Sequence, residues 1–569
     1  MKKISLLLVL MVSVVSITLA QRTISGTITD DTGEALIGAS VVAKGTTVGT
    51  ITDIDGSYSL NVADDVSMLV VSYTGFDTRE IEVGASNVMD VTLSEGVELS
   101  EVVVTATGLE ANKARLGYAV QNVNPDELTG SKETNIVNAL SSKVAGVIVT
   151  SSSGSPGASS NIRIRGNTSI NGTNSPLFII DGVPIDNSSN VSNYGNGDGT
   201  DGVDYSNRAV DINSMDVESM TVLKGPAATA LYGVRAANGA IVITTKRGAA
   251  GKPQINIGAS MSFDQVNQLP ERQNQYAQGR FLNGVPTYQG PETFNGFSWG
   301  PEISSLEFDG ATDYPFDKNG ALVPAGTGNG QPANIYDPYT YFKTGITNDI
   351  NASVAGGGDL GNYYISAGRL SSDGIVPNST FERTSFRVNT DINITDKLTA
   401  GMSANFVKSG GDRIQRGSNL SGVMLGLLRN SPTFDIGNGK EGQEAADDPD
   451  TYIFPDGTQR SYRFGIYDNP YWTSNRNPSR DNVNRVIGYA KLAYQISDNL
   501  SVNYKLGIDQ YTDERTAAID IEINRGIPGQ LYQETYNNQD LNSDLFFTFF
   551  NKVTKVLIDI LIFLDLISS

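Results

Sequence analysis

NIRIRGNTSINGTNSPLFIIDGVPID (residues 161–186) and INSMDVESMTVLKGPAATALYGVRAANGAIVITTKRG (residues 212–248) are the two stretches that decide the fold. Both are runs of short β-branched strands interrupted by glycine, a pattern typical of a compact domain with tight turns. The isolated peptide EVVVTA precedes them at residues 101–106, and long segments of alternating apolar and polar residues follow from Pro253. This order predicts a glycine-rich domain between an extended peptide and a series of membrane-type strands.

The composition restricts the classes of function. A chain of 569 residues is too long for one ordinary domain, and its 60 glycines and 24 tyrosines favour β-structure with many turns. The net charge of −21 would repel the phosphate backbone of a nucleic acid. The chain contains neither cysteine nor histidine. Disulfides, Cys/His zinc sites and Ser-His or Cys-His catalysis are therefore excluded, and we expect no cofactor, no metal and no enzymatic activity.

The first 20 residues have the pattern of a cleaved signal peptide. Met1, Lys2 and Lys3 form a positive start, residues 4–17 are apolar, and Thr18-Leu19-Ala20 supplies a small-residue cleavage site. The apolar run is shorter than the roughly 20 residues that a membrane-spanning helix needs. We therefore expect export from the cytoplasm.

Residues 21–97 form a first predicted domain. Strand-like runs follow one another at short intervals and are separated by turns at residues 30–33 and 55–56, so we expect a seven-stranded β-sandwich. The pattern resembles the carboxypeptidase-regulatory-like domain family at Gly26, Gly33, Gly38, Ala39, Gly45, Thr46, Gly49, Thr50, Asp53, Gly56 and Tyr58. A peptidase would need zinc-binding histidines, and the chain has none. The resemblance therefore implies a folding or docking module.

The linker at residues 98–111 contains the extended peptide. It has high β propensity and no turn residue, so it is either one more sandwich strand or a peptide that adds to the sheet of a partner. Its position between two domains favours the second interpretation. It resembles the TonB box of TonB-dependent receptors, which implies that periplasmic TonB binds it by strand addition, through Glu101, Val102, Val103, Val104, Thr105 and Ala106.

Residues 112–250 are predicted to form an α+β domain. We expect an amphipathic helix over residues 135–144, one helical turn at residues 227–232, and strands at residues 146–150, 161–165, 178–181, 220–223 and 241–245. The strings RIRG, FIIDGVP, VLKGPAATALYG and ANGAIVITTK resemble, in order and spacing, the plug domain of the SusC/RagA subfamily of TonB-dependent receptors. The plug-motif residues implied by this resemblance are Arg163, Arg165, Gly166, Asp181, Gly182, Lys224, Gly225, Tyr232 and Gly233.

Arg163 and Arg165 allow two interpretations. Strand alternation places them opposite Ile162 and Ile164, so they either form a charge network between plug and barrel wall or are solvated strand residues. We favour the network, because neutralised carboxylates of a barrel lumen would hold a plug that must still be released.

Residues 251–550 have the signal of a transmembrane barrel. Phe386, Val388, Thr390, Ile392 and Ile394 form one stripe, with Arg387, Asn389, Asp391 and Asn393 on the other face. Tight turns at residues 395–397 and 497–499 join such strands, whereas residues 264–347 and 409–484 are long loops. A soluble β-sandwich is the alternative, but it would seldom tolerate loops of this length. Lipid-facing apolar stripes and a watery lumen explain the pattern better.

The number of strands is low for a closed barrel. We find about nine candidates, whereas plugged outer-membrane transporters use 22. An open edge in hydrocarbon would leave backbone groups without partners, so we expect only the N-terminal part of a barrel. Residues 551–569 break the alternation, and we interpret this atypical tail as the product of a frameshifted or prematurely ended reading frame.

The predicted fold class is thus mainly β: a sandwich, an α+β plug and part of an antiparallel transmembrane barrel. The family resemblance implies TonB-dependent active import of a large nutrient, an oligosaccharide or a peptide, across the outer membrane. It also implies a SusD-like surface lipoprotein as partner. Two alternatives are a ligand-sensing signalling receptor of the outer membrane and a secreted β-rich adhesin or hydrolase. Neither has a supporting feature, because no extra domain fits ahead of the sandwich and no carboxylate pair frames a cleft. No feature of the sequence identifies the substrate.

Overall fold

The structure is a computed structural model of the chain. It describes residues 21–549 and 564–568, except for residues 45, 47, 64–65, 85, 95–101, 105–109, 113–119, 131–132, 171–172, 190–202, 226–231, 416–421 and 522–527. The predicted signal peptide and most of the predicted helical turn at residues 227–232 lie outside the described residues. The chain divides into two compact units. The first comprises residues 1–103 and 110–116, and the second comprises residues 104–109 and 117–569.

The first unit contains a β-sandwich. Its strands are β1 (Gln21–Asp30), β2 (Ser40–Ala43), β3 (Gly49–Ile51), β4 (Ser57–Ala63), β5 (Met68–Ser72), β6 (Arg79–Glu82) and β7 (Val91–Leu93). They form two sheets, in the orders β4-β1-β7 and β3-β2-β5-β6, around a core that includes Ile24, Val41 and Leu69. The seven-stranded prediction is confirmed. Gly26 is required here, because an added Cβ would lie 1.9 Å from the carbonyl oxygen of Met89.

The linker holds two short strands. β8 (Val102–Val104) and β9 (Glu110–Asn112) form a two-stranded sheet of their own. The interpretation of the extended peptide as one more sandwich strand is therefore wrong, since β8 belongs to neither sheet of the sandwich. Glu101, Thr105 and Ala106 lie outside the described residues.

The second unit begins with the plug. Its strands are β10 (Val120–Val123), β11 (Val147–Ser151), β12 (Ser160–Ile164), β13 (Leu177–Ile180), β14 (Val183–Ile185), β15 (Val217–Leu223) and β16 (Ala240–Thr245). Five of them form a mixed sheet in the order β10-β15-β16-β13-β14, and β11 pairs with β12. Helix α2 (Pro125–Gly130) and the 3₁₀ helices η2 (Asn138–Leu140), η3 (Arg208–Asp211), η4 (Ser214–Asp216) and η6 (Gly233–Ala236) complete the plug.

The amphipathic helix predicted over residues 135–144 is wrong. Only η2 is helical, because two polar features compete with the helix at its ends. The Asn135 side chain accepts a hydrogen bond from the backbone N–H of Val137, and Ser142 adopts a left-handed φ of 64° after an extended Ser141. Serine and asparagine offer the backbone such local alternatives to helical hydrogen bonds. The buried apolar residues of the segment still pack into the plug core, as Val137 and Leu140 show.

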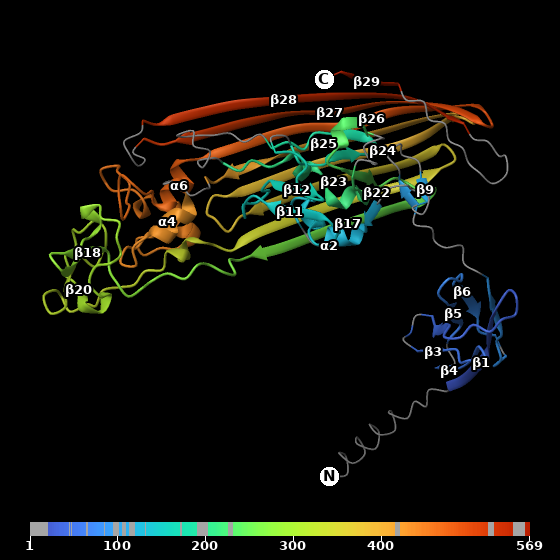
Figure 1. Ribbon diagram of the computed structural model, residues 1–569, viewed down its shortest axis with the longest axis horizontal. Helices are drawn as coiled ribbons and strands as arrows, with labels where there is room; N and C mark the ends of the chain where they lie inside the picture. The colour runs from blue at the N-terminus through green and yellow to red at the C-terminus, as the bar shows by residue number, and fades with distance from the viewer. Residues whose placement is uncertain are drawn as a thin grey trace, which may run out of the picture. The chain divides into compact units, whose positions relative to one another are not determined.

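A nine-stranded antiparallel sheet follows, which we call the wall. Its strands, in sheet order, are β17 (Gly251–Asp264), β22 (Gly345–Gly358), β23 (Gly361–Asp373), β24 (Thr380–Thr395), β25 (Leu398–Arg413), β26 (Ser479–Ser497), β27 (Leu500–Ile519), β28 (Gln530–Phe549) and β29 (Leu564–Ser568). The plug elements lie against one face of this sheet (Figure 1). Strand β29 comes from the predicted atypical tail and pairs with β28, whereas residues 550–563 lie outside the described residues.

The other face of the wall is apolar. On β24, Phe386 and Ile392 are 46% and 48% exposed, whereas Arg387 and Asn389 between them are each 2% exposed. The same pattern recurs on β25 with Phe406 and on β26 and β27, and β17 likewise exposes its apolar stripe. A sheet that exposes its apolar stripe and buries its arginines has the polarity of a membrane wall rather than of a soluble sandwich. The prediction of a partial transmembrane barrel is confirmed as a fold class.

The long loops fold into their own elements at one end of the wall (Figure 1). They contain β18 (Gly279–Leu282), β19 (Val285–Tyr288), β20 (Leu306–Phe308), β21 (Leu322–Pro324), α4 (Val423–Arg429), α5 (Gly442–Asp447) and α6 (Pro470–Arg476), together with four 3₁₀ turns, η7 (Pro291–Thr293), η8 (Ile303–Ser305), η9 (Pro338–Tyr341) and η10 (Pro449–Thr451). An aromatic core that includes Tyr341, Tyr471 and Trp472 joins the two loops. Among the described residues, no helix is both long and apolar enough to cross a membrane.

Candidate functional site

Buried arginines of the wall dominate the surface between plug and wall. Arg383 and Arg387 lie on β24, Arg413 ends β25, and Arg485 lies on β26. Each is at most 4% exposed. Strand alternation directs them toward the plug because outward positions such as Phe386 carry the apolar stripe. The wall therefore presents guanidinium groups to the plug, and two of them, Arg413 and Arg485, also pair with wall carboxylates.

Asp211 in η3 accepts hydrogen bonds from two wall strands. Arg485 Nη1 lies 3.1 Å from its Oδ2, and Ser409 Oγ of β25 donates to its Oδ1 at 2.6 Å. Asp509 on β27 holds the same arginine through two hydrogen bonds of 2.8 Å. One guanidinium thus bridges a carboxylate of the plug and a carboxylate of the wall.

Asp186, which follows β14, extends this cluster. Its backbone carbonyl accepts from Arg485 Nη2 at 2.8 Å, and its backbone N–H donates to Asp509 Oδ2 at 2.8 Å. Tyr511 Oη donates to its carboxylate at 2.7 Å. The carbonyl oxygen of Arg208 accepts from Arg485 Nη1 at 2.9 Å. Arg485 therefore joins β26 and β27 to two separate segments of the plug.

A second cluster surrounds Asp216. Tyr364 Oη and Ser366 Oγ of β23 donate to its Oδ1 at 2.9 and 2.6 Å. Arg387 Nε lies 3.6 Å from its Oδ2, and Arg387 Nη1 lies 3.9 Å from Oδ2 of Asp181. Arg387 is thus attracted to two plug carboxylates at distances longer than those of the Arg485 hydrogen bonds.

Removing one charged side chain from this interface is costly, whereas moving the whole plug away from the wall lets water hydrate both surfaces. Removing one member of a buried ion pair typically costs about 3–5 kcal/mol, since the other charge is left without compensation. When two polar surfaces part, however, water replaces the hydrogen bonds of both. The arrangement can therefore hold a plug firmly and still release it.

Most of the predicted plug-motif residues occupy tight turns. Left-handed backbone is found at Arg165 and Gly166 (φ 59° and 93°), Asp181 and Gly182 (49° and 79°), Gly225 (99°) and Gly233 (66°). Asp181 and Gly182 form the two-residue turn between the paired strands β13 and β14, and the Asp181 carboxylate accepts from the backbone N–H and Oγ1 of Thr245 at 2.9 and 2.7 Å. Tyr232 precedes η6 and is its N-cap residue.

Lys224 lies inside the plug near these turns. Its Nζ donates to Oε1 of Gln121 on β10 at 2.7 Å. Burial, and to a smaller extent the like charge of Arg165, lowers the pKa of Lys224. The lysine therefore ties the end of β15 to its sheet neighbour β10.

The favoured role of Arg163 and Arg165 as plug-to-wall links stays a prediction, since both side chains are exposed and none of their contacts among the described residues reaches the wall. Ile162 and Ile164 point into the plug core, so alternation leaves both arginines exposed. Arg163 Nε donates to Oδ1 of Asn161 on its own strand at 3.1 Å. In the described part of the chain, three ion pairs between plug and wall join plug aspartates to wall arginines. A fourth has the opposite sense, because Arg247 of the plug pairs with Asp391 of β24 at 2.9 Å.

The sequence reasoning missed three plug aspartates, Asp186, Asp211 and Asp216, and three wall arginines, Arg383, Arg413 and Arg485. Arg387 was placed on the inner face by its stripe, and Arg383 and Arg485 share that face by the same period of two. Asp186, Asp211 and Asp216 lie in loops or single turns, where no periodic signal indicates which surface a side chain joins.

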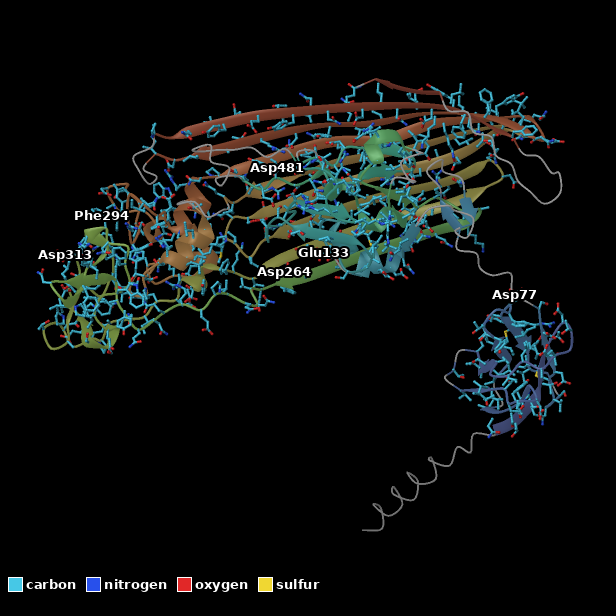
Figure 2. The ribbon with its side chains drawn as sticks, in the orientation of Figure 1. Asp77, Glu133, Asp264, Phe294, Asp313 and Asp481 are labelled. Carbon is cyan, nitrogen blue, oxygen red and sulfur yellow. The ribbon has the colours of Figure 1, made fainter. Side chains whose placement is uncertain are left out.

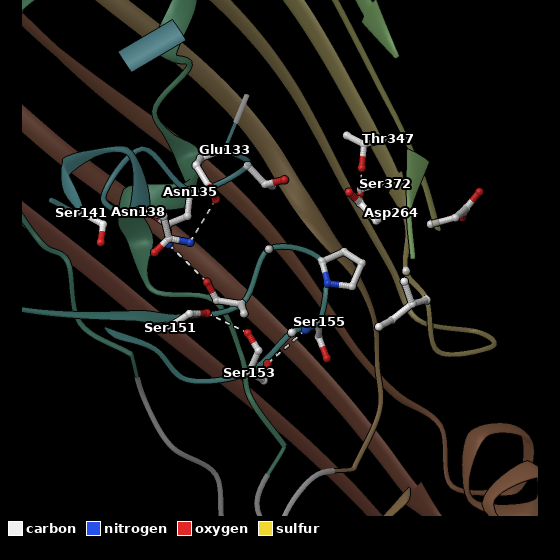
Figure 3. Close-up of a pocket in the computed structure, with 18 of the residues that line it drawn as sticks. Glu133, Asn135, Asn138, Ser141, Ser151, Ser153, Ser155, Asp264, Thr347 and Ser372 are labelled. Carbon is white, nitrogen blue, oxygen red and sulfur yellow. Dashed lines mark hydrogen bonds between the residues drawn. The ribbon is translucent and has the colours of Figure 1, made fainter. Parts of the chain in front are cut away.

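A polar cavity of about 500 Å³ lies between the plug and the loop ends of β17, β22 and β23 (Figure 3). Plug residues such as Glu133, Asn138 and Ser153 face Asp264 and Thr347 of the wall. Its described lining contains carboxylates, hydroxyls and amides but no lysine or arginine. The cavity therefore suits a neutral or cationic polar ligand better than an anion. The described residues contain no cluster of three or more metal-binding side chains.

Comparisons with known proteins agree with this architecture. The CarboxypepD_reg-like domain matches residues 24–104, and the TonB-dependent Receptor Plug Domain matches residues 112–240. TonB-dependent receptor SusC of Bacteroides thetaiotaomicron is 34% identical over 407 residues, which cover 71% of this chain and 35% of that protein. TonB-dependent receptor P26 of Formosa agariphila is 33% identical over 388 residues, covering 67% of this chain and 34% of that protein.

A solved structure shows the same fold at lower identity. The RagAB peptide importer in its open-open state aligns with a TM-score of 0.57 and 19% identity, over 80% of this chain and 47% of that chain. In the closed-closed state the TM-score is 0.55 with 20% identity, over 77% of this chain and 46% of that chain.

A plug held by buried ion pairs against a wall with an apolar outer face defines the class of plugged outer-membrane receptors. The chain belongs to the TonB-dependent receptors, and within them to the SusC/RagA type. It spans about a third to a half of the length of the curated relatives that it matches. These relatives are receptors and not enzymes.

Proposed function

We propose that this receptor actively imports a large nutrient, an oligosaccharide or a peptide, across the outer membrane with energy delivered by TonB. The observation that carries the proposal is the plug–wall interface. The Arg485 and Arg387 clusters keep the plug against the wall through contacts that water can replace. A nutrient too large for a passive pore needs such a plug, because an open channel would admit other solutes as well.

The direction of transport follows from the two ends of the wall. Tight turns such as residues 395–397 lie at one end and the folded loops at the other, which in outer-membrane barrels are the periplasmic and extracellular ends. The polar cavity beside Asp264 and Thr347 opens at the loop end and is the proposed entry chamber. The substrate thus meets the plug from outside, and a SusD-like surface lipoprotein is the proposed partner there.

The energy would enter through the extended peptide at residues 101–106. Strand addition uses backbone hydrogen bonds, so TonB can grip this segment whatever ligand the receptor carries. Strand β8 already has the extended backbone that such pairing requires. Tension on the linker would reach the plug through β10, whose first described residue is Val120.

The test compares two substitutions at one position of the full-length receptor. Val103→Pro removes a backbone donor and should abolish accumulation of labelled oligosaccharide and peptide mixtures in cells. Val103→Ile keeps the backbone donor and should retain uptake. The receptor must reach the outer membrane equally in both strains, as fractionation would show. Unchanged uptake by the proline variant would contradict TonB-driven import.

A further inference from the structure

A second cavity, of about 420 Å³, lies in the outer loops and not beside the plug. Four of its nine lining residues are phenylalanines from distant parts of the chain: Phe294, Phe316, Phe454 and Phe464. The first two come from the loop between β17 and β22, and the others from the loop between β25 and β26. Figure 2 labels Phe294 within this loop region. A ligand in this phenylalanine pocket would contact both loops at once.

The aromatic rings of the pocket are arranged in two pairs. Phe316 and Phe454 meet edge to face with centroids 5.2 Å apart, and Phe294 and Phe464 lie 6.4 Å apart. Phe294 is 53% exposed although it is a large apolar residue. Its φ of 57° is unusual for an aromatic residue, and such strain persists only where the surroundings enforce it. Here Arg463 Nε donates to the Phe294 carbonyl at 3.2 Å.

A rigid turn presents Phe454. Residues 454–457 read Phe-Pro-Asp-Gly, and the Gly457 N–H donates to the Phe454 carbonyl at 2.8 Å. Gly457 supplies the left-handed φ of 86° that follows the Pro-Asp pair, and the Phe454 N–H donates to the Thr458 carbonyl at 2.8 Å. The pocket wall is therefore preformed, which reduces the entropy that a ligand loses on binding.

The polar groups beside the pocket are already hydrogen-bonded within the protein. Gln459 Nε2 donates to Asp468 at 2.9 Å, and its Oε1 accepts from the Asn469 N–H at 2.8 Å. Asp456 Oδ1 accepts from the Thr458 N–H and Oγ1 at 2.9 and 2.6 Å. A sugar ring would find a hydrogen-bond acceptor only at the edge of the pocket, in the second oxygen of Asp456, and would bury its other hydroxyls without partners. A hydrocarbon group would lose no hydrogen bond.

We propose that the phenylalanine pocket binds an aromatic or large aliphatic side chain of a peptide, so that the imported nutrient is a peptide. The proposal rests on the import function proposed above and names its substrate class. Asp456 lies exposed at the edge of the pocket, where its second oxygen can accept from a peptide N–H or an ammonium group. The hydrogen bonds from Thr458 lower the pKa of Asp456, so this carboxylate stays charged at neutral pH.

The first test measures binding to the full chain in detergent micelles by ligand-observed NMR. The probes are N-acetyl-phenylalanine amide and a linear glucose trisaccharide. The phenylalanine probe should bind, with its ring protons receiving more saturation than its acetyl methyl, and the trisaccharide should not compete. Uniform saturation along the probe, or competition by the trisaccharide, would overturn the proposal even if no variant could be prepared.

The second test uses matched substitutions in two outer loops. Phe464→Ser removes one ring of the pocket and should weaken probe binding roughly five- to tenfold, the loss expected for one aromatic contact. Phe281→Ser removes a ring that is 64% exposed on β18 and should leave binding unchanged. Equal affinity of both variants for the phenylalanine probe would contradict the proposal that the probe binds in this pocket. Loss of a co-purifying surface lipoprotein from the Phe464 variant, with probe binding intact, would assign the pocket to a partner protein instead.

The outcome separates this proposal from the import proposal. Probe binding in micelles needs no TonB, so Val103→Pro should leave it unchanged. If that variant still imports nutrient while the probe binds, the import mechanism fails and the pocket stands. If the variant loses uptake but the wild-type chain binds the trisaccharide and not the phenylalanine probe, import stands and the peptide assignment is overturned.

Discussion

At the scale of single residues, Arg485 is the side chain that links plug and wall most directly. Arg485→Ala would leave Asp211 and Asp509 buried with the guanidinium missing, which should lower the free energy of unfolding by about 3–5 kcal/mol. Urea titration of the protein in micelles, followed by circular dichroism, measures this change. Protease sensitivity of the plug should rise in parallel, since the Arg485 contacts reach two plug segments.

Arg369 provides the matched control for Arg485. It also pairs with a carboxylate of the wall, Glu382, at 3.0 Å, but the two side chains are 61% and 57% exposed. Arg369→Ala should therefore change the free energy of unfolding by less than about 1 kcal/mol. Comparable losses in both variants would mean that burial does not set the strength of the plug–wall contacts.

The same residues show how far sequence reasoning reaches. Alternation is a local property, and it placed Arg387 on the inner face of β24 and Ile162 on the strand face opposite Arg163, which is the face that the plug core buries. It gave no information on partners, because Asp211 and Arg485 are brought together only by the packing of plug on wall. It also left the partner of Arg163 open, and among the described strands β12 pairs with β11 in a hairpin of the plug.

At the scale of elements, the outer stripe of the wall makes a prediction about lipid. Phe406 on β25 is 51% exposed and lies directly across from Phe386 on β24. Phe406→Lys should destabilise folding into lipid vesicles by about 2–4 kcal/mol if this position lies near the bilayer midplane. Phe281→Lys, in an outer loop, should have no comparable effect. Unimpaired insertion of the Phe406 variant would argue that this face does not contact lipid.

The sandwich makes a separate prediction about pH. Asp90 accepts from the N–H and Oγ1 of Thr27, both at 2.8 Å, and these bonds lower the pKa of Asp90 below its usual value of 3.8. A folded pKa below the unfolded one stabilises the fold above pH 3.8, and this stability is lost as the pH falls through the folded pKa. Urea unfolding of residues 21–94 should thus become easier below pH 4.

Asp90→Asn isolates the contribution of this carboxylate. The variant should be less stable than the wild type at pH 7 and should lose less stability between pH 7 and pH 3. Asp30, whose pKa is also lowered by hydrogen bonds from Thr32, would add to the remaining dependence. If the free energy of unfolding depends on pH identically in the variant and the wild type, the Thr27 contacts of Asp90 do not contribute to the stability of the sandwich.

At the scale of the whole molecule, the order of domains was predictable and the loops were not. Each wall hairpin repeats one local pattern, and the sandwich and plug are marked by short strands with tight turns. The folded loops depend on contacts between residues far apart in the sequence, such as Tyr341 with Tyr471, whose ring centroids are 4.8 Å apart. No period in the sequence indicates such pairs.

The final prediction concerns movement of the plug as a body. Val183 on β14 and Gly507 on β27 face each other, and a Cβ added to Gly507 would lie 3.4 Å from the Val183 Cβ. That separation is close to the range of about 3.5–4.5 Å for disulfides, so Val183→Cys with Gly507→Cys should crosslink plug and wall. The chain contains no other cysteine, so a mobility shift on non-reducing gels would report this bond alone.

Suppose that import is possible only when the plug leaves the wall at β14. In that case the oxidised double variant of the full-length receptor should bind its substrate but fail to import it. A reductant should then restore uptake. Each single cysteine variant should import with and without reductant, which separates the crosslink from the loss of Val183 packing. Full uptake by the oxidised double variant would mean that the substrate passes while β14 stays on β27. The release of the Arg485 cluster would then be no part of transport, because Asp186 follows directly on β14.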